Sequence, residues 1–124
     1  MKKINKDNLD EFINYYHSFN DSNIVSVNYD ILNEKIEIII NTFWSGEPVL
    51  KEDNTFETNK TKIKMVLSGV IECNNKEMFS WDDINEVYLK YIKLHNKEYI
   101  CFASDKENPS IYVVCDSIEY EEVK

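Results

Sequence analysis

Two segments of the chain alternate apolar and polar residues with a period of two, and this pattern constrains the fold more than any other feature. The first segment spans residues 36–44 and the second spans residues 61–67. Their alternating apolar residues are Ile36, Ile38, Ile40, Ile63, Met65 and Leu67. Successive side chains of a strand point to opposite faces, so this period is typical of strands that bury one face. We therefore expect an antiparallel sheet with one apolar and one mostly polar face.

Further short segments carry β-branched and aromatic residues, which favour strands. Val25, Val27 and Tyr29 are expected to share one face of a strand that forms a hairpin with residues 36–44. Residues 80–95 fit either a helix or a strand, and we favour a strand from about residue 85. The remaining expected strands are 98–103, 111–115 and 118–123, with the last at a sheet edge.

A helix is indicated near the beginning of the sequence, in residues 7–19. Its apolar residues follow the i, i+3, i+4, i+7 spacing of an amphipathic helix, and they are Leu9, Phe12, Ile13 and Tyr16. Asp7 is the expected N-cap. Together with the strands, this helix predicts a single α+β domain over residues 1–124. In it, an N-terminal helix packs on a mainly antiparallel, twisted sheet of about six to seven strands.

The charge balance excludes several classes of function. The chain has 23 acidic and 14 basic residues, for a formal net charge of −9, and every basic residue is a lysine. Such a charge repels phosphate backbones and anionic lipid, so we expect no binding of nucleic acid or membrane and instead a basic protein partner. The only glycines are Gly46 and Gly69, so no glycine-rich phosphate loop is present. Gly69 interrupts a strand pattern, which indicates a bulge or a close backbone approach.

The cysteines and the first residues bear on the cellular location. Cys73, Cys101 and Cys115 form no CxxC pair and lie in apolar, strand-like segments. We expect them to be buried and reduced, as in a reducing cytosol. The first residues are rich in lysine, but no apolar signal-peptide segment follows them. We therefore expect a cytoplasmic protein without a metal or other cofactor.

Acidic residues gather beside large aromatic residues in three segments, 44–57, 79–83 and 119–122. The first lies in an expected exposed loop of about 15 residues, a length that compact domains usually keep for function. Aromatic anchors surrounded by charge are typical of protein interfaces, although a solvated acidic face with its rings in the core would give the same pattern. The candidate partner-binding residues are Trp44, Glu47, Glu52, Asp53, Phe56, Trp81, Asp82 and Asp83.

His17 and Asp21 lie four residues apart at the end of the expected helix. A histidine oriented by a carboxylate can act as a general base or a metal ligand, so an alternative is a small-ligand or metal-dependent enzyme. Its pocket would lie between helix and sheet near His17 and Asp21, with His95 as an optional third residue. A helix-terminal histidine and a turn-capping aspartate explain the same residues without catalysis. A third alternative is a subunit that self-associates through a sheet edge.

Two short motifs resemble a known family. Residues 19–24 (FNDSNI) precede the expected first strand, and residues 65–70 (MVLSGV) end a central strand. The order of these parts resembles small bacterial immunity proteins of polymorphic toxin systems. There, Phe-His-Asp opens the first strand and a Phe-x-Gly-Val-like turn follows a central strand, whereas Asn20 and Leu67 stand at the histidine and aromatic positions here. The resemblance implies a cytoplasmic, non-catalytic protein that binds and blocks a cognate basic toxin, and it transfers no catalytic residues.

Overall fold

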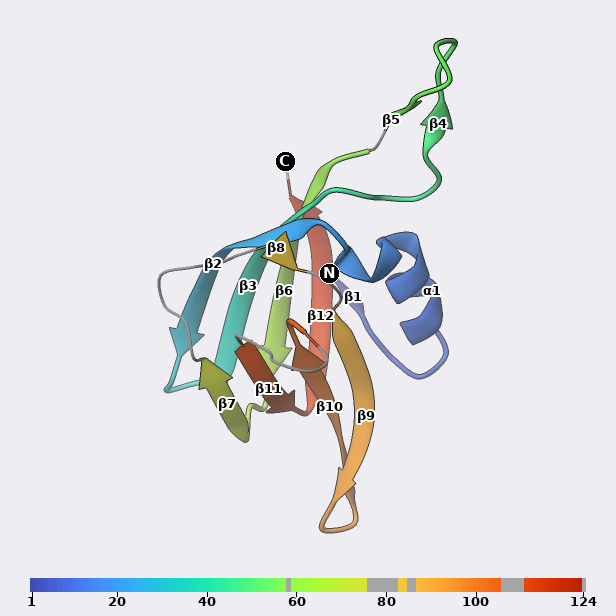
Figure 1. The fold of residues 1–124 in the computed structure, drawn as a ribbon. Helices are drawn as coiled ribbons and strands as arrows, with labels where there is room; N and C mark the ends of the chain where they lie inside the picture. Colours follow the sequence, from blue (N-terminus) through green and yellow to red (C-terminus); the bar gives the residue numbers. More distant parts are fainter. Residues whose placement is uncertain (58, 76–82, 85–86, 106–110, 124) are drawn as a thin grey trace.

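The structure is a computed structural model that describes residues 1–57, 59–75, 83–84, 87–105 and 111–123 (Figure 1). Its helical elements are α1 (Leu9–Tyr15) and the single turn η1 (His17–Phe19). The strands of the larger sheet are β1 (Lys2–Lys3), β2 (Ser22–Asp30), β3 (Lys35–Thr42), β6 (Thr61–Ser68), β8 (Asp83–Ile84) and β12 (Ser117–Val123). The smaller sheet consists of β7 (Glu72–Asn75), β9 (Tyr88–Leu94), β10 (Lys97–Ala103) and β11 (Ile111–Cys115). A separate ribbon contains β4 (Val49–Leu50) and β5 (Phe56–Glu57).

All described strand pairs are antiparallel. The strand order is β1-β12-β6-β3-β2-β8 in the larger sheet and β7-β11-β10-β9 in the smaller one. The α+β expectation, with mainly antiparallel strands, is confirmed. The expectation of one sheet with six to seven strands is wrong, because the described strands divide among three sheets.

The core lies between the two larger sheets, and α1 closes one side of it (Figure 1). The larger sheet contributes buried side chains from alternating positions, namely Ile36, Ile38, Ile40, Ile63, Met65, Leu67 and Ile118. The smaller sheet contributes Ile100, Phe102, Ile111, Val113 and Cys115. Two sheets that face each other bury both apolar faces, whereas one sheet extended edge to edge would leave most of this surface in water. The predicted alternation of residues 36–40 and 63–67 is thereby confirmed.

Strand β2 departs from the predicted alternation. Its register with β3 shifts between Ile24 and Ser26, which is the signature of a β-bulge. As a result Ile24 is buried and Val25 is exposed, while Val27 packs partly against the core. The expectation that Val25 shares the inner face with Val27 is therefore wrong, because the extra residue reverses the side-chain direction.

Helix α1 is shorter than expected. Asn8, and not Asp7, occupies the N-cap, and it makes no side-chain capping bond. The backbone N–H groups of Asp7 and Asn8 instead donate to the side-chain oxygen of Asn5, at 2.8 and 3.0 Å. The helix ends because residues 17–19 adopt positive φ values of 53° to 58°. No helix in the described ranges is long and apolar enough to cross a lipid bilayer.

Several further expectations can be compared with the structure. Strand β9 confirms the strand interpretation for residues 88–94, whereas residues 76–82 and 85–86 lie outside the described part. Strand β12 is not at the edge, because β1 pairs with it through Lys2 and Lys3. The close approach expected at Gly69 is confirmed. Its φ is +67°, and a Cβ there would clash with the carboxylate of Asp116.

The three cysteines differ in environment. Cys101 and Cys115 are buried as expected, and burial raises the pKa of the Cys115 thiol to about 12. Cys73 is exposed, contrary to the expectation, because β7 is the outermost strand of the smaller sheet.

We predict that a thiol reagent labels native protein at Cys73 only, since the thiolate is the reactive form and the other two sulfur atoms are shielded. Absorbance titration of thiols with and without denaturant measures this directly. Cys73→Ser should abolish the labelling of native protein, and labelling of all three thiols before unfolding would contradict the structure.

Two leucines give a matched test of the core. Leu67 is fully buried between Ile36 and Ile118 on the neighbouring strands, whereas Leu32 is 96% exposed in the turn between β2 and β3. We expect Leu67→Ala to lower the free energy of unfolding by about 2–5 kcal/mol, because it removes buried methyl groups and leaves a cavity. Leu32→Ala should change it by less than about 0.5 kcal/mol. Urea unfolding measures both, and equal effects would place the core elsewhere.

Candidate docking surface

A two-stranded ribbon formed by β4 and β5 stands away from the two larger sheets (Figure 1). Within it, Val49 pairs with Glu57 and Leu50 with Phe56. A turn closes its end, where the N–H of Lys51 donates to the carbonyl oxygen of Thr55 at 2.8 Å. The expected exposed loop therefore contains a hairpin, and its position on the outside of the molecule agrees with the expectation.

The ribbon exposes large apolar side chains. Val49, Leu50 and Phe56 are 56%, 59% and 61% exposed, and the latter two lie opposite each other across the strands. A two-stranded hairpin on its own is only marginally stable in water. Burial of this surface by a partner would contribute roughly 25 cal/mol for each Å² removed from water. The ribbon is therefore a candidate surface for contact with another molecule.

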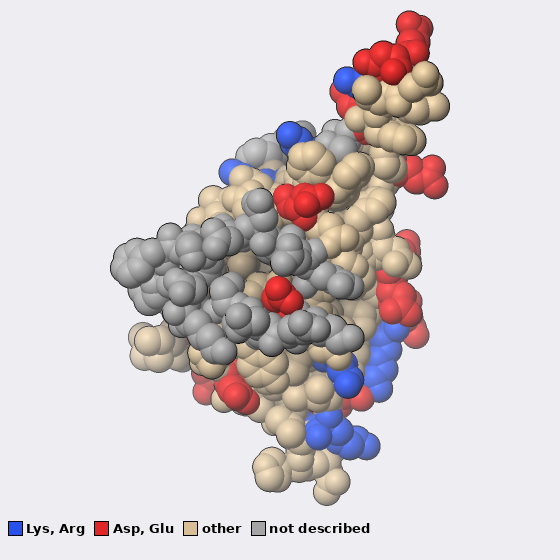
Figure 2. Space-filling view, in the orientation of Figure 1, with Lys and Arg blue, Asp and Glu red and all other residues tan. Residues whose placement is uncertain are grey.

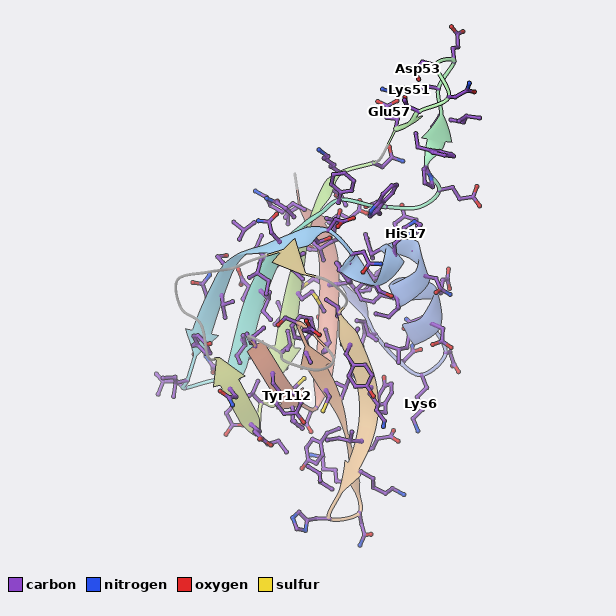
Figure 3. All side chains as sticks on the ribbon, in the orientation of Figure 1. Lys6, His17, Lys51, Asp53, Glu57 and Tyr112 are labelled. Atoms are coloured by element: carbon purple, nitrogen blue, oxygen red, sulfur yellow. The ribbon has the colours of Figure 1, made fainter. Side chains whose placement is uncertain are left out.

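Charged side chains surround these apolar groups. Residues 47–57 contain four carboxylates and one lysine, namely Glu47, Lys51, Glu52, Asp53 and Glu57. We refer to residues 47–57 as the acidic ribbon. Figure 2 shows acidic side chains gathered at its outer end, and Figure 3 labels Lys51, Asp53 and Glu57 there.

The carboxylates of the acidic ribbon are available to a partner. Ion pairs in the described part of the chain join Lys6 to Glu98, Lys64 to Glu37 and Lys97 to Asp116, all of them outside the ribbon. The hydroxyl and the N–H of Thr55 donate to the Asp53 carboxylate at 2.6 and 3.0 Å. These hydrogen bonds hold the pKa of Asp53 below its usual value, so that it stays charged at neutral pH.

The base of the acidic ribbon is fixed to η1 and to the start of β2. The indole N–H of Trp44 donates to a carboxylate oxygen of Asp21 at 3.2 Å, and the rings of Trp44 and His17 lie 5.8 Å apart between centroids. Nε2 of His17 donates to the carbonyl oxygen of Gly46 at 2.6 Å, since a carbonyl can only accept. The N–H of Gly46 donates in turn to the carbonyl oxygen of Tyr15 at 2.8 Å.

A left-handed backbone turn positions His17 and Asp21 for these contacts. His17, Ser18, Phe19 and Asp21 all have φ values between 53° and 61°. For residues other than glycine this conformation costs roughly 1–2 kcal/mol each. Phe19 is fully buried in the core, and its burial offsets part of this cost. A 2.7 Å hydrogen bond from the N–H of Val87 to the carbonyl oxygen of Ser18 offsets a further part.

The structure brings together five of the eight candidate partner-binding residues. Glu47, Glu52, Asp53 and Phe56 lie on the acidic ribbon, and Trp44 lies at its base. Trp81 and Asp82 lie outside the described residues, and Asp83 lies on β8, where it pairs through its backbone with Asn23 of β2. The sequence-based candidates do not include Val49, Leu50 and Glu57, although Glu57 belongs to the same acidic segment. The apolar residues 49–50 and Phe56 on either side of a polar stretch were the available signal for a hairpin.

His95 lies far from the other two residues of the enzyme alternative. His17 and Asp21 each contact Trp44, whereas His95 lies in the turn between β9 and β10, at the other end of the molecule from η1 (Figure 1). The expectation that His95 shares a pocket with them is wrong. The described residues include no group of three or more metal-ligating side chains that could hold an ion.

No protein-family model matches the chain, and no curated protein matches it. The residues that carry the resemblance to immunity proteins have structural roles here. Phe19 is a core residue, and the hydroxyl of Ser22 accepts the N–H of Phe43 at 3.3 Å. Leu67 is buried, and Gly69 makes the close approach to Asp116.

Gly46 gives a direct test of the ribbon base. Its φ is +67°, and a Cβ would lie 3.4 Å from the ring of Tyr15. We expect Gly46→Ala to lower the free energy of unfolding by about 1–2 kcal/mol, because alanine is strained in this conformation. Gly46→Asn should cost less, since asparagine tolerates left-handed φ. Denaturant unfolding measures both variants, and an alanine variant as stable as the wild type would rule out the backbone conformation described here.

Proposed function

We propose that the chain is a non-catalytic, cytoplasmic binding protein that docks a basic protein partner through its acidic ribbon. One observation carries this proposal. Three large apolar side chains are exposed on a protruding hairpin and are surrounded by four carboxylates without an ion-pair partner among the described residues. Exposed apolar groups rimmed by charge are the usual composition of an interaction site.

The two kinds of residue would contribute differently to binding. Phe56 and Leu50 would enter a pocket of the partner and supply most of the affinity, as buried aromatic and aliphatic anchors do. The carboxylates would steer the basic partner during encounter and increase the association rate. The contacts of Trp44 with His17 and Asp21 would hold the base of the hairpin, which reduces the entropy lost on binding.

We further infer that the partner is a toxin domain, as the resemblance to immunity proteins implies. A toxin that acts on nucleic acid must present a cationic surface to its substrate. A protein with a formal net charge of −9 can cover such a surface by charge complementarity. Inhibition would then occur by occlusion and would require no catalytic residue in this chain.

The test uses the purified products of the genes that flank the gene for this chain. We expect one of them to be basic and to bind, with an association rate that falls steeply as salt increases. Glu52→Gln combined with Asp53→Asn should slow association, and Phe56→Ser should speed dissociation by about tenfold or more. Surface plasmon resonance measures both rates.

The matched control is Glu34→Gln combined with Glu72→Gln, which removes the same charge from the turn before β3 and from the start of β7. These positions lie far from the acidic ribbon (Figure 1), so the control should bind as the wild type does. If the control slows association as much as the ribbon variant, overall charge and not the ribbon is responsible. If no flanking product binds, the toxin proposal is wrong.

A further inference from the structure

A pocket of about 820 Å³ opens between α1 and the edge of the larger sheet formed by β1 and β12. This volume lies within the range of small-molecule sites, roughly 300–1,000 Å³. Its walls carry four aromatic rings, those of Phe12, Tyr15, Tyr16 and Tyr120, and three carboxylates, those of Glu11, Glu121 and Glu122. We refer to it as the tyrosine pocket.

The rings of the tyrosine pocket are held in place by the core. Tyr16 is buried and stacks on Phe19, with ring centroids 5.2 Å apart, and Tyr120 lies 4.4 Å from Phe12 between centroids. The hydroxyl of Tyr16 donates to a carboxylate oxygen of Glu122 at 3.0 Å. Burial and the Glu122 carboxylate raise the pKa of Tyr16 well above its usual value, so this hydroxyl remains a donor. The pocket is therefore formed in advance of any ligand.

The side chains that line the pocket carry a net negative charge, since the carboxylates of Glu11, Glu121 and Glu122 outnumber the ammonium group of Lys2. None of the three forms an ion pair with a described lysine, and Lys2, which also lines the pocket, lies within ion-pair distance of no described carboxylate. Burial raises the pKa of Tyr120, and the negative charges of Glu11 and Glu122 raise it further. The negative charges of Glu11 and Glu122 therefore both act on the side chain of Tyr120.

The arrangement of the carboxylates in the pocket favours an organic cation over a metal ion. The described carboxylates include no group of three close enough to hold a metal ion. Their charges surround aromatic surface instead, and an aromatic face attracts a cation that brings apolar groups with it. The complementary ligand is larger than a metal ion and carries its positive charge on an organic group.

We propose that the tyrosine pocket binds an organic cation, an alkylammonium or a guanidinium group. The cation lies against the rings of Tyr15 and Tyr120, and Glu11, Glu121 and Glu122 balance its charge. Two sources offer this chemistry, a lysine or arginine side chain of a protein and a free polyamine. The walls of the site come from α1, β1 and β12 and their flanking residues, and one of them, Tyr15, also contacts Gly46 at the base of the acidic ribbon.

Calorimetric titration tests the proposal with three probes: N-acetyl-arginine amide, spermidine and, as the neutral control, N-acetyl-glutamine amide. We expect one or both cations to bind and the neutral probe not to bind. The tighter of the two cations identifies the source. Ring resonances of Tyr16 and Tyr120 in NMR spectra should shift with the same titration, which places the cation in the pocket.

Two variants remove the proposed contacts without disturbing the core. Tyr15 is half exposed, and Tyr15→Leu should weaken cation binding about fivefold, which corresponds to about 1 kcal/mol of cation–π attraction. Glu122→Gln keeps an acceptor for Tyr16 but removes the charge, and it should weaken binding by a similar factor. The matched control is Glu52→Gln, which removes one charge from the acidic ribbon and should leave binding unchanged.

Four outcomes would overturn the proposal. The first is the absence of binding by both cationic probes. The second is an equal loss of affinity in Glu52→Gln, which would attribute binding to overall charge. The third is stoichiometric displacement of the probe by magnesium chloride, which would make the site a metal site. Loss of binding in Glu52→Gln alone would place the cation on the acidic ribbon and would leave the tyrosine pocket empty.

Discussion

The packing of β3 and β6 against β10 and β11 is the interaction on which the rest of the structure depends. The buried residues of β3 and β6 belong to the same hydrophobic cluster as Phe102 and Val113, and they are Ile36, Ile38, Ile40, Ile63, Met65 and Leu67. Each fully buried side chain of this kind contributes roughly 1.5–3 kcal/mol relative to an exposed one. This contact encloses many of the large apolar side chains. Those left exposed include Val49, Leu50 and Phe56 on the acidic ribbon, as well as Ile31 and Leu32 in the turn between β2 and β3.

The core also determines how the acidic ribbon is held. Phe19 is buried beside Phe12, and this burial fixes a left-handed turn that its backbone would otherwise disfavour. The turn aims His17 at Gly46 and brings Asp21 to Trp44. A strained turn that is maintained by the core is a frequent feature of functional sites. Here it connects the buried core to the base of a hairpin whose large apolar side chains are exposed.

Local patterns in the sequence predicted the strands and the acidic character of the protruding segment. The alternation in residues 36–40 and 63–67 is sufficient to predict strands, because successive side chains of a strand point to opposite faces of the sheet. The acidic ribbon was recognised as a candidate because its charges and Phe56 are close in sequence. These features need no knowledge of tertiary structure.

The features that sequence reasoning missed depend on contacts between distant segments. The bulge after Ile24 has no local glycine to indicate it, and the choice of two sheets over one depends on which apolar faces meet. Cys73 is exposed only because β7 ends its sheet. The acidic cluster around Tyr120 is visible in the sequence, but the tyrosine pocket also needs α1, which lies at the opposite end of the sequence from β12.

Hydrogen–deuterium exchange of the chain, alone and in complex with the basic product of a flanking gene, tests the central claim most directly. Docking by the acidic ribbon predicts slower amide exchange in residues 47–57 when the partner is bound, since the ribbon's backbone becomes shielded from water. The exposed turn between β2 and β3 should exchange at the same rate in both states. Protection of that turn, with unchanged exchange in the acidic ribbon, would contradict the proposed docking surface.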